Sequence, residues 1–395
     1  MKYTGMCGKV NVGSGGLLVD VGSLCACFAG LSARRSNRGV RYDVATILVL
    51  VVLGKIAGED CLCGVAEWVR HREKVLAKAL RWSKARVPHR TTFSRILGHA
   101  VNLEEFELGV SAFFNSSAQQ GRPLVVNLDG KTLRGTIPAG ESEGLRLLAA
   151  FLPEEGWVLM QVEVGQGENE ISAAPRLLQA MDLRNKVVTG DAMLAQRALS
   201  IQIVEGGGEY IWPVKENQPQ LRRDIETLFE PEHCVKGFSP GVTDFRTAET
   251  REKGHGRMER RAITVSGELK GYLDWPCAEQ VYKLERDTVR VKDCKATHQV
   301  LYGITSLTAE EAGPERLLQL TRAHWLIENG LHYRRDETLR EDWCHLRTGH
   351  AAHAMATINN LVLGLLLRRG VTNVPAARRY YAAHLNEALR LILRC

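Results

Sequence analysis

The sequence contains no long apolar run, no internal repeat and no low-complexity tract, and these absences exclude several classes of protein. The most apolar segment, Val44–Gly58, has an unbroken core of about ten residues before Lys55, fewer than the ~20 that a membrane-spanning helix needs. In the Gly-rich residues 1–40 the basic cluster follows the apolar stretch instead of preceding it, which argues against a signal peptide. We therefore expect no membrane partner and a poorly ordered segment 1–40.

Cysteine pairs with metal-binding spacing are also missing. None of the ten cysteines forms a Cys-x-x-Cys pair, and the two Cys-x-Cys pairs have no His or Cys partners at zinc-finger spacing. Scattered reduced thiols are typical of cytoplasmic proteins, so neither a zinc finger nor a disulfide framework is expected.

The charge balance excludes little. Lys and Arg total 52 against 45 Asp and Glu, a formal net charge of +7, and the composition is 45% hydrophobic and 25% charged. This is an ordinary globular composition. The small basic excess is compatible with a polyanionic partner but does not establish one.

The apolar periodicity changes along the chain and predicts its organisation. Residues 41–120 show helical spacing, and we expect a small helical domain there. From Pro123 the pattern predicts strands and helices in the order β-β-β-α-β-α-β-α, which favours a mixed sheet with helices on both faces. The further expected parts are a main domain over 121–370, a β-rich insertion over about 230–308 inside it, and a C-terminal helix over 371–395.

Two predicted strands end in a carboxylate. Asp129 follows "PLVVNL" and stands before a predicted turn, and Asp191 follows "KVVTG". In an alternating sheet the strand ends converge on the crevice where ligands bind. Asp is also common at strand-to-turn junctions because its side chain bonds nearby amides, so neither residue alone indicates a site.

A third acid lies on the predicted helix within Pro314–Arg340. Glu328 has His324 at i−4 and His332 at i+4, a row that could hold a metal or could be a solvated stripe, and we favour the stripe. Carboxylates bind Mg²⁺ while neighbouring cations bind a polyanion, so an acid among cations suits phosphate chemistry. Cations that crowd this helix near Glu328 include Arg322, Arg334 and Arg335.

Six motifs follow one another along the chain: "VVNLDGKTLRGT", "NEISAAPRLL", "VVTGDAMLAQ", "YIWPVKENQPQL", "EKGHGRMERR" and "RAHWLIENGLH". They resemble the motifs of DDE transposases from bacterial insertion sequences, in the branch that includes the H-repeat-associated proteins. The resemblance runs from about Arg41 to Gly370, and "VPHRTTFSRIL" also resembles the helical domain that precedes the catalytic core in that branch.

The resemblance implies a fold and a reaction. The fold is an α/β, ribonuclease H-like mixed sheet with a β-rich insertion, preceded by a small helical domain. The reaction is cleavage and transfer of DNA strands by two Mg²⁺ ions, for which Mn²⁺ can substitute, bound to Asp129, Asp191 and Glu328. The implied partners are double-stranded DNA, as transposon ends and target, and a second copy of the chain, in the nucleoid of the cytoplasm.

The same motifs suggest residues that contact DNA. Lys131 and Arg134 follow Asp129 and are expected near the cut phosphate, although Arg134 fits an ordinary exposed turn nearly as well. Lys215 and Asn217 end a predicted strand, where they position DNA or cap the next helix.

Further candidates lie in the insertion and on the last catalytic helix. His255 and Arg257 stand beside glycines that let backbone approach a ligand, or belong to a solvated strand edge. His324 and Asn329 are expected to orient Glu328 or to contact the phosphate, and a purely structural role fits them equally well. Arg335 is a further candidate for DNA contact, at a position where larger relatives have a lysine.

Three other functions fit part of the pattern. A transposase-derived DNA-binding protein without activity would share every motif. A structure-specific nuclease on the same fold would cut without joining strands. A simple metal-dependent phosphohydrolase fits poorly, because it would not need a leading helical domain and widely spread cations.

Overall fold

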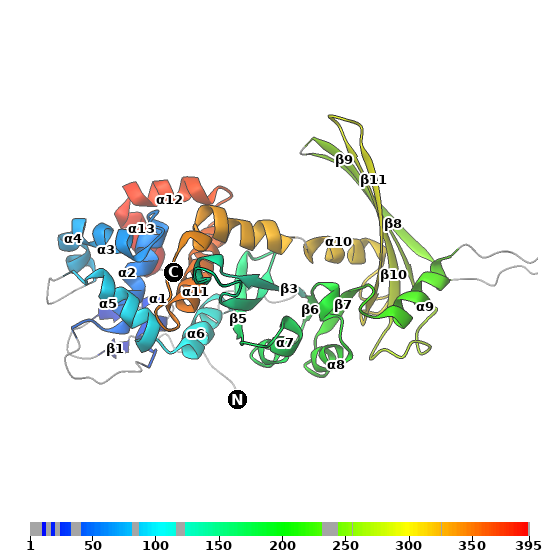
Figure 1. The fold of residues 1–395 in the computed structure, drawn as a ribbon, viewed down its shortest axis with the longest axis horizontal. Helices are drawn as coiled ribbons and strands as arrows, with labels where there is room; N and C mark the ends of the chain where they lie inside the picture. The colour runs from blue at the N-terminus through cyan, green and yellow to red at the C-terminus, as the bar shows by residue number, and fades with distance from the viewer. Residues whose placement is uncertain are drawn as a thin grey trace, which may run out of the picture.

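The computed structural model describes residues 10–12, 17–19, 24–32, 41–80, 87–115, 123–230, 244–254, 256–324 and 326–393. Figure 1 shows helices at one end of the long axis, strands and helices in the middle, and the long strands β8–β11 at the other end. Within the segment predicted to be poorly ordered, only three short elements are described. These are β1 (Val10–Val12), β2 (Leu17–Val19) and α1 (Leu24–Ala29).

Nine strands of the described chain form one mixed sheet in the order β5-β4-β3-β6-β7-β11-β10-β9-β8. The pairs β3–β6 and β6–β7 are parallel and the other neighbours are antiparallel. The first five strands and their order confirm the predicted ribonuclease H-like α/β fold. Their bounds are β3 Leu124–Thr132, β4 Arg146–Leu152, β5 Trp157–Val164, β6 Lys186–Thr189 and β7 Glu209–Val214.

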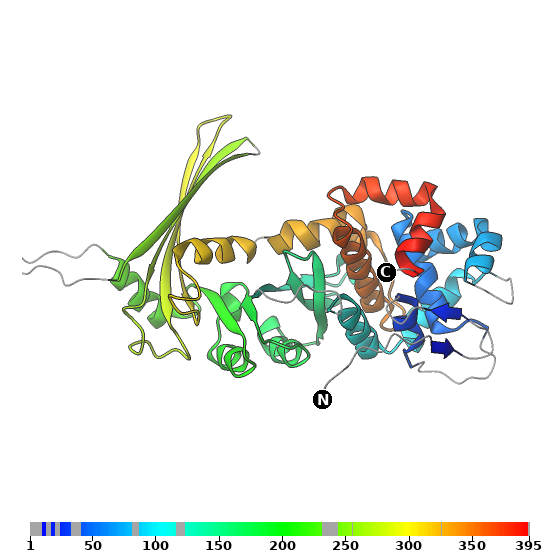
Figure 2. The ribbon, with the colours of Figure 1, turned by 180° about the vertical axis from the view of Figure 1, so that it is seen from behind.

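The strands between residues 246 and 305 extend this sheet instead of forming a separate layer. β11 pairs antiparallel with β7, so the sheet continues without interruption into the long strands. Figures 1 and 2 both show the free ends of these strands curving back above α10 (Pro314–His324). Their bounds are β8 Arg246–Gly254, β9 Arg257–Ser266, β10 Gln280–Arg290 and β11 Ala296–Thr305.

Helices cover both faces of the central strands. α7 (Glu170–Gln179) and α8 (Arg197–Glu205) lie on one face and α10 on the other, as Figures 1 and 2 show. Alternate residues of β3 serve the two faces, because Val126 packs in the large core with α7 and α8 while Val125 packs with α10. The remaining helix on this part of the chain is α9 (Pro219–Phe229).

The helical end combines segments from both ends of the chain. Figure 1 shows α11–α13 packed beside the helices of the N-terminal part, and one apolar core joins them to β4 and β5. No helix of the described chain is both long and apolar enough to cross a membrane. The helices are α2 Val44–Ile56, α3 Leu62–His71, α4 Glu73–Ala79, α5 Arg90–Arg95, α6 Leu103–Asn115, α11 Ala351–Arg368, α12 Val374–Ala383 and α13 Leu385–Leu393.

The segment 371–395, predicted as a C-terminal helix, forms two helices, α12 and α13. The Asn373 side chain accepts a hydrogen bond from the Ala376 amide, and Pro375 stands in the first turn of α12. Proline is favourable there because the first-turn amides have no intrahelical partner, so this proline starts a helix.

A buried polar cluster joins α6, β5 and α11. The Glu107 carboxylate accepts a hydrogen bond from Gln161 at 2.7 Å and lies 3.3 Å from Nε2 of His353. Burial lowers the pKa of His353, but the carboxylates of Glu107 and Glu163, 3.3 Å and 3.9 Å from its ring nitrogens, outweigh this effect and raise it to about 9. The imidazole is therefore a cation at neutral pH and holds the helical end to the sheet.

This cluster makes the stability of the fold depend on pH. The folded pKa of His353 is above the unfolded value of 6.5, so its contribution is complete below pH 6.5 and is lost as the pH rises through about 9. We expect the difference in thermal unfolding midpoint between the wild type and His353→Gln to shrink steadily over that range. Parallel pH curves for the two proteins would contradict this assignment.

Candidate active site

Asp129 lies within β3 and not in a turn after it. The prediction of a turn is wrong, because β3 continues to Thr132 and pairs with β4 through Asp129↔Ala149 and Lys131↔Leu147. The parallel partner β6 stops earlier, at Asn127↔Thr189. Asp129 therefore lies where β3 has β4 on one side and has passed the end of β6 on the other.

Asp191 comes two residues after β6, at the same end of the sheet as Asp129. It is the N-cap of a 3₁₀ turn, η4 (Ala192–Leu194), and its Oδ1 accepts hydrogen bonds from the amides of Met193 and Leu194. The side chain of Asn217, which follows β7, donates a hydrogen bond to the carbonyl of Ala192 and so connects this turn to the end of β7. Parallel strands thus bring both aspartates to one edge, as predicted.

The helix that carries Glu328 is attached directly to β3. The buried Asn127 side chain donates to the carbonyls of Ala323 at 2.7 Å and His324 at 3.2 Å, at the end of α10. Asn127 and Asp129 share a face of β3, since side chains alternate along a strand. The strand therefore places Asp129 beneath the segment that follows α10. That segment contains two π-helical stretches, η5 (Glu328–His332) and η6 (Arg334–Thr338).

Ligand atoms of Asp129, Glu328 and His332 lie within 4.8 Å of one another, so these three side chains could hold a metal ion. Nδ1 of His332 is 3.5 Å from Asp129 Oδ2 and 3.4 Å from Glu328 Oε2. The prediction that the His–Glu–His row is a solvated stripe is wrong for His332, because only 5% of this residue is exposed. The π-helical turn carries its imidazole under Glu328 and against β3.

The acids at this edge repel one another. Burial raises the pKa of Asp129 to about 7, and the next contribution is the charge of Glu170 at the start of α7. Asp191 and Glu328 raise it further, against a hydrogen bond from the Gly130 amide that lowers it. Glu170 was not singled out from the sequence, although it stands in the quoted motif "NEISAAPRLL". An acid directly after Asn169 there reads as an ordinary first-turn residue.

His332 meets the acids as a neutral ring. Burial lowers its pKa to about 3, and the charges of Arg335 and Lys131 add to the effect. A neutral imidazole offers a lone pair to a metal ion. Carboxylate oxygens and one imidazole form a donor set that suits a divalent cation, which would relieve the repulsion among the acids.

Two of the predicted DNA-contacting residues beside Asp129 are ion-paired. Both carboxylate oxygens of Asp336 lie 2.6 Å from the Lys131 ammonium, whose side chain is only 9% exposed. Arg134 is 80% exposed, with its Nε 3.8 Å from Asp342. Arg134 is thus open to a ligand, whereas Lys131 reaches one only by leaving Asp336.

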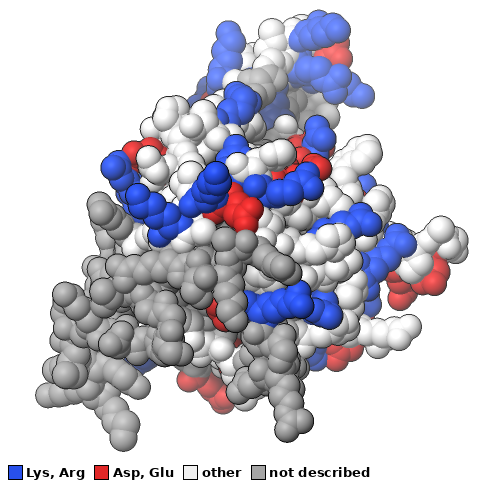
Figure 3. All heavy atoms as spheres, turned by 90° about the vertical axis from the view of Figure 1, so that its left-hand side faces the viewer, with Lys and Arg blue, Asp and Glu red and all other residues white. Residues whose placement is uncertain are grey.

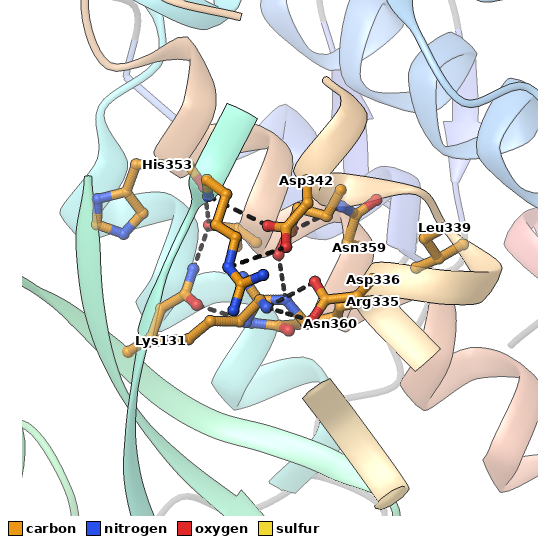
Figure 4. Close-up of polar contacts among 12 residues, drawn as sticks. Lys131, Arg335, Asp336, Leu339, Asp342, His353, Asn359 and Asn360 are labelled. Carbon is orange, nitrogen blue, oxygen red and sulfur yellow. Dashed lines mark hydrogen bonds and ion pairs between the residues drawn. The ribbon is translucent and has the colours of Figure 1, made fainter. Parts of the chain in front are cut away.

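Arg335 contradicts its prediction as a DNA contact. Its side chain is fully buried, and Nε donates to Glu341 at 2.7 Å. Figure 4 shows Arg335 near Asn359, which donates to the other oxygen of Glu341 at 2.8 Å. The physical reason is that Glu341 is itself buried and needs a cation beside it. Arg335 is therefore a core residue.

The other predicted contacts are spread over the molecule. Lys215 is exposed and stands two residues before Asn217, which bonds the Asp191 turn. Burial lowers the pKa of His324, while the nearby charge of Asp191 opposes the shift. Arg257 begins β9 opposite Arg290, at the free tips of the strands, with Nε 3.8 Å from Glu259. His255 and the side chain of Asn329 lie outside the described residues.

Comparison with known proteins agrees with this geometry. A family model described as Transposase DDE domain matches residues 120–365, and a second, described as DDE_Tnp_1-associated, matches residues 25–114. The chain belongs to the DDE transposase family. The resemblance predicted from the six motifs is thereby confirmed.

Relatives from Escherichia coli match most of this transposase-family chain. "H repeat-associated putative transposase YhhI" is 30% identical over 373 residues, covering 88% of this chain and 94% of its own. "Putative protein YbfL" is 30% identical over 368 residues, which cover 87% of this chain and 92% of YbfL. "Putative transposase YncI" is 27% identical over 342 residues, which cover 84% of this chain and 84% of YncI. A piggyBac transposase in a synaptic complex with hairpin DNA aligns with a TM-score of 0.40 and 9% identity, over 91% of this chain and 76% of that one.

Removing the charge of Asp129 is expected to stabilise the metal-free protein. Because the folded pKa of about 7 exceeds the ordinary value of 3.8, the ionised carboxylate costs stability, increasingly from pH 4 to 7 and constantly above. Asp129→Asn should therefore melt a few degrees higher than the wild type at pH 8 in EDTA, with little difference at pH 4. A variant that melts lower at pH 8 would contradict the repulsion.

The buried pair of Arg335 and Glu341 predicts a large loss of stability. Arg335→Met leaves a buried carboxylate without its cation, which costs about 3–5 kcal/mol in the free energy of unfolding. The double variant Arg335→Met/Glu341→Gln should recover most of this loss, because Gln keeps an acceptor for Asn359. Urea denaturation measures both. If Arg335→Met has normal stability but binds DNA weakly, Arg335 contacts DNA and the assignment as a core residue is wrong.

Proposed function

We propose that this member of the DDE transposase family binds the ends of its own mobile element and catalyses metal-dependent strand cleavage followed by strand transfer. One observation carries the proposal. Asp129, Asp191 and Glu328 come from three motifs far apart in the sequence, yet Glu328 lies beside Asp129, and Asp191 lies close enough to raise the pKa of Asp129. Membership of the DDE transposase family supports this chemistry, and the cluster of acids is the structural feature of this chain that fits it.

The three acids are the proposed ligands of two Mg²⁺ ions, with Mn²⁺ able to substitute. Asp129 is central, because Glu328 and His332 lie beside it and the charge of Asp191 raises its pKa. Bound divalent ions supply charge neutralisation at a phosphodiester and lower the pKa of water at the reacting phosphorus. The polypeptide holds the acids ready on a strand, a capped turn and an anchored helix.

His332 and Asn127 have positioning roles in this proposal. Asn127 fixes the end of α10 to β3 and so sets the height of Glu328 above Asp129. His332, neutral and buried, faces both carboxylates from below and excludes bulk water on that side. No Ser, Cys or Tyr nucleophile is needed for phosphoryl transfer to water or to a 3′-hydroxyl.

Exposed cations support DNA as the substrate. Lys215 and Arg134 are exposed on the segments that follow β7 and β3, while Lys131 would act after exchanging Asp336 for a phosphate. Figure 3 shows Lys and Arg outnumbering Asp and Glu on the visible surface of the helical end. We propose that this end contacts the element's DNA through phosphates. The exposed cations of α3–α5 include Arg70, Lys74, Lys78, Arg90 and Arg95.

The proposed reaction also sets the assembly and the place of action. Joining both ends of an element to one target needs two active sites held together, so we propose a homodimer in the complex with DNA. The substrate is chromosomal DNA, which places the protein at the nucleoid in the cytoplasm.

Strand cleavage is the direct test of the function. Duplex DNA carrying the boundaries of the element that encodes the chain should be cut in Mg²⁺ or Mn²⁺ and joined to a target plasmid. Replacing Asp129, Asp191 or Glu328 by Ala should lower the rate at least about 100-fold, because each change removes a proposed metal ligand. Labelled products on a sequencing gel measure both steps.

Asp182→Asn is the matched control, since Asp182 pairs with Arg184 on the surface. Its rate should equal that of the wild type. Cutting without joining would favour a nuclease over a transposase. Specific DNA binding with no cutting in either metal would favour an inactive DNA-binding protein, and would contradict the proposed chemistry.

A further inference from the structure

Trp343 is 78% exposed, more than any other large apolar side chain of the described chain. It ends a 3₁₀ turn, η7 (Glu341–Trp343). Among the described residues, no aromatic ring or cation stacks on its indole. Single exposed apolar residues are common on protein surfaces, so the surroundings of this ring decide whether it belongs to a site.

The backbone on both sides of Trp343 is held in place. Glu341, which begins the turn, is buried, and its carboxylate is ion-paired in the core. On the other side, a Cβ built on Gly135 would fall 2.6 Å from the carbonyl oxygen of Cys344 and 2.8 Å from that of Asp342. The φ angle of Gly135 is not positive, so this close approach, and not the backbone conformation, requires a glycine. The turn therefore presents the exposed ring on a fixed support.

The segment from Glu328 to Trp343 lies along the continuation of β3, from the candidate active site outward. Three contacts join the two segments in the same order along both. They are His332 Nδ1 to Asp129 Oδ2 at 3.5 Å, Lys131 Nζ to Asp336 Oδ1 at 2.6 Å (Figure 4), and the Arg134 amide to Asp342 Oδ1 at 3.1 Å. From Asp129 to Arg134 the chain advances five residues, which span at most about 17 Å at ~3.3 Å per residue.

Arg134 supplies an exposed cation next to this turn. Its side chain is 80% exposed, and its Nε lies 3.8 Å from Asp342, the residue before Trp343. An exposed ion pair of this length contributes little to stability, so the guanidinium can exchange its carboxylate for a phosphate. Proteins bind single-stranded nucleic acid with cations that take phosphates and with aromatic rings on which bases stack. Both groups are present here, at the outer end of the two segments.

We propose that Trp343 stacks on an unpaired base of the DNA strand that enters the active site, while Arg134 binds a phosphate of the same strand. Bases inside a duplex are covered by their neighbours, so an indole on the surface selects a base that has left the stack. The base lies within about five nucleotides of the reacting phosphate, because a strand advances ~3.4 Å per nucleotide. This deepens the proposed function and rests on it for the identity of the strand.

Binding of an oligothymidylate of about ten nucleotides to the full-length protein in EDTA tests the proposal without depending on catalysis. Trp343→Ala should raise the dissociation constant about tenfold, because a stacked base is lost. Trp343→Phe should lose less, since it keeps a ring. Fluorescence anisotropy of the labelled oligonucleotide measures the constants.

Tyr272→Ala is the matched control, because Tyr272 is 72% exposed and lies between β9 and β10, away from these segments. It should bind as the wild type does. Trp343→Ala should melt at the wild-type temperature, which excludes unfolding as the cause. An unchanged dissociation constant for Trp343→Ala, or a wild type that does not bind the oligonucleotide, would overturn the proposal.

The salt dependence of binding separates the ring from the cation. Arg134→Gln should weaken binding and reduce the slope of log K against log salt by about 0.7, because one phosphate contact with a single strand is lost. Trp343→Ala should leave the slope unchanged, since stacking on a base releases no counterion. An equal reduction of the slope in both variants would show that Trp343 acts only by holding Arg134, and would overturn the stacking role.

Sedimentation and strand cleavage distinguish this proposal from its alternatives. If Trp343→Ala dissociates a dimer without DNA and binds oligothymidylate normally, the ring is a subunit contact and the inference is overturned. If the wild type cuts DNA and Trp343→Ala binds normally, the inference alone fails. If the wild type does not cut DNA but Trp343→Ala binds oligothymidylate weakly, the stacking site stands and only the proposed chemistry fails.

Discussion

The parallel pairing of β3 with β6 is the constraint on which the site depends. It brings Asp129 and the turn of Asp191 to one end of the sheet, and it stops at Asn127, so that Asp129 stands beyond the last parallel pair. Asn127, on the same strand, fixes the end of α10. The π-helical segment that follows α10 then holds Glu328 next to Asp129. Strand pairing, a side-chain amide and a π-helical turn together concentrate negative charge at one edge.

The surrounding cations do not neutralise that charge. Lys131 is bound to Asp336, and Arg335 is bound to Glu341 in the core, so the nearest basic side chains are occupied by other acids. Figure 4 shows these pairs meeting between the strands and the last helices. They fix the segment after Glu328 to the body of the protein. Burial raises the pKa of Asp129, the repulsion among the acids raises it further, and both effects favour binding of a divalent cation.

Much of the fold could be predicted because apolar periodicity reports buried faces, and the order of strands and helices from residue 123 to 229 follows it. Asp129 and Asp191 could be found because acids after buried strands share an edge. His332 could not be placed, since a regular-helix reading of the His–Glu–His row does not show the π-helical turn that buries it. Arg335 was misassigned because burial of a charge depends on a partner, Glu341, that only the fold brings near. The effect of Glu170 on the pKa of Asp129 was missed because an acid in the first turn of a helix is ordinary in the sequence.

The central claim is that the acids of three motifs form one site for divalent cations. Anomalous diffraction from crystals of the protein grown with Mn²⁺ and cleaved-end DNA tests it most directly. The account predicts two peaks about 4 Å apart. Both should lie within bonding distance of Asp129, with one also bound by Glu328 and the other by Asp191. Peaks elsewhere, or none in crystals that contain ordered DNA at this edge, would contradict it.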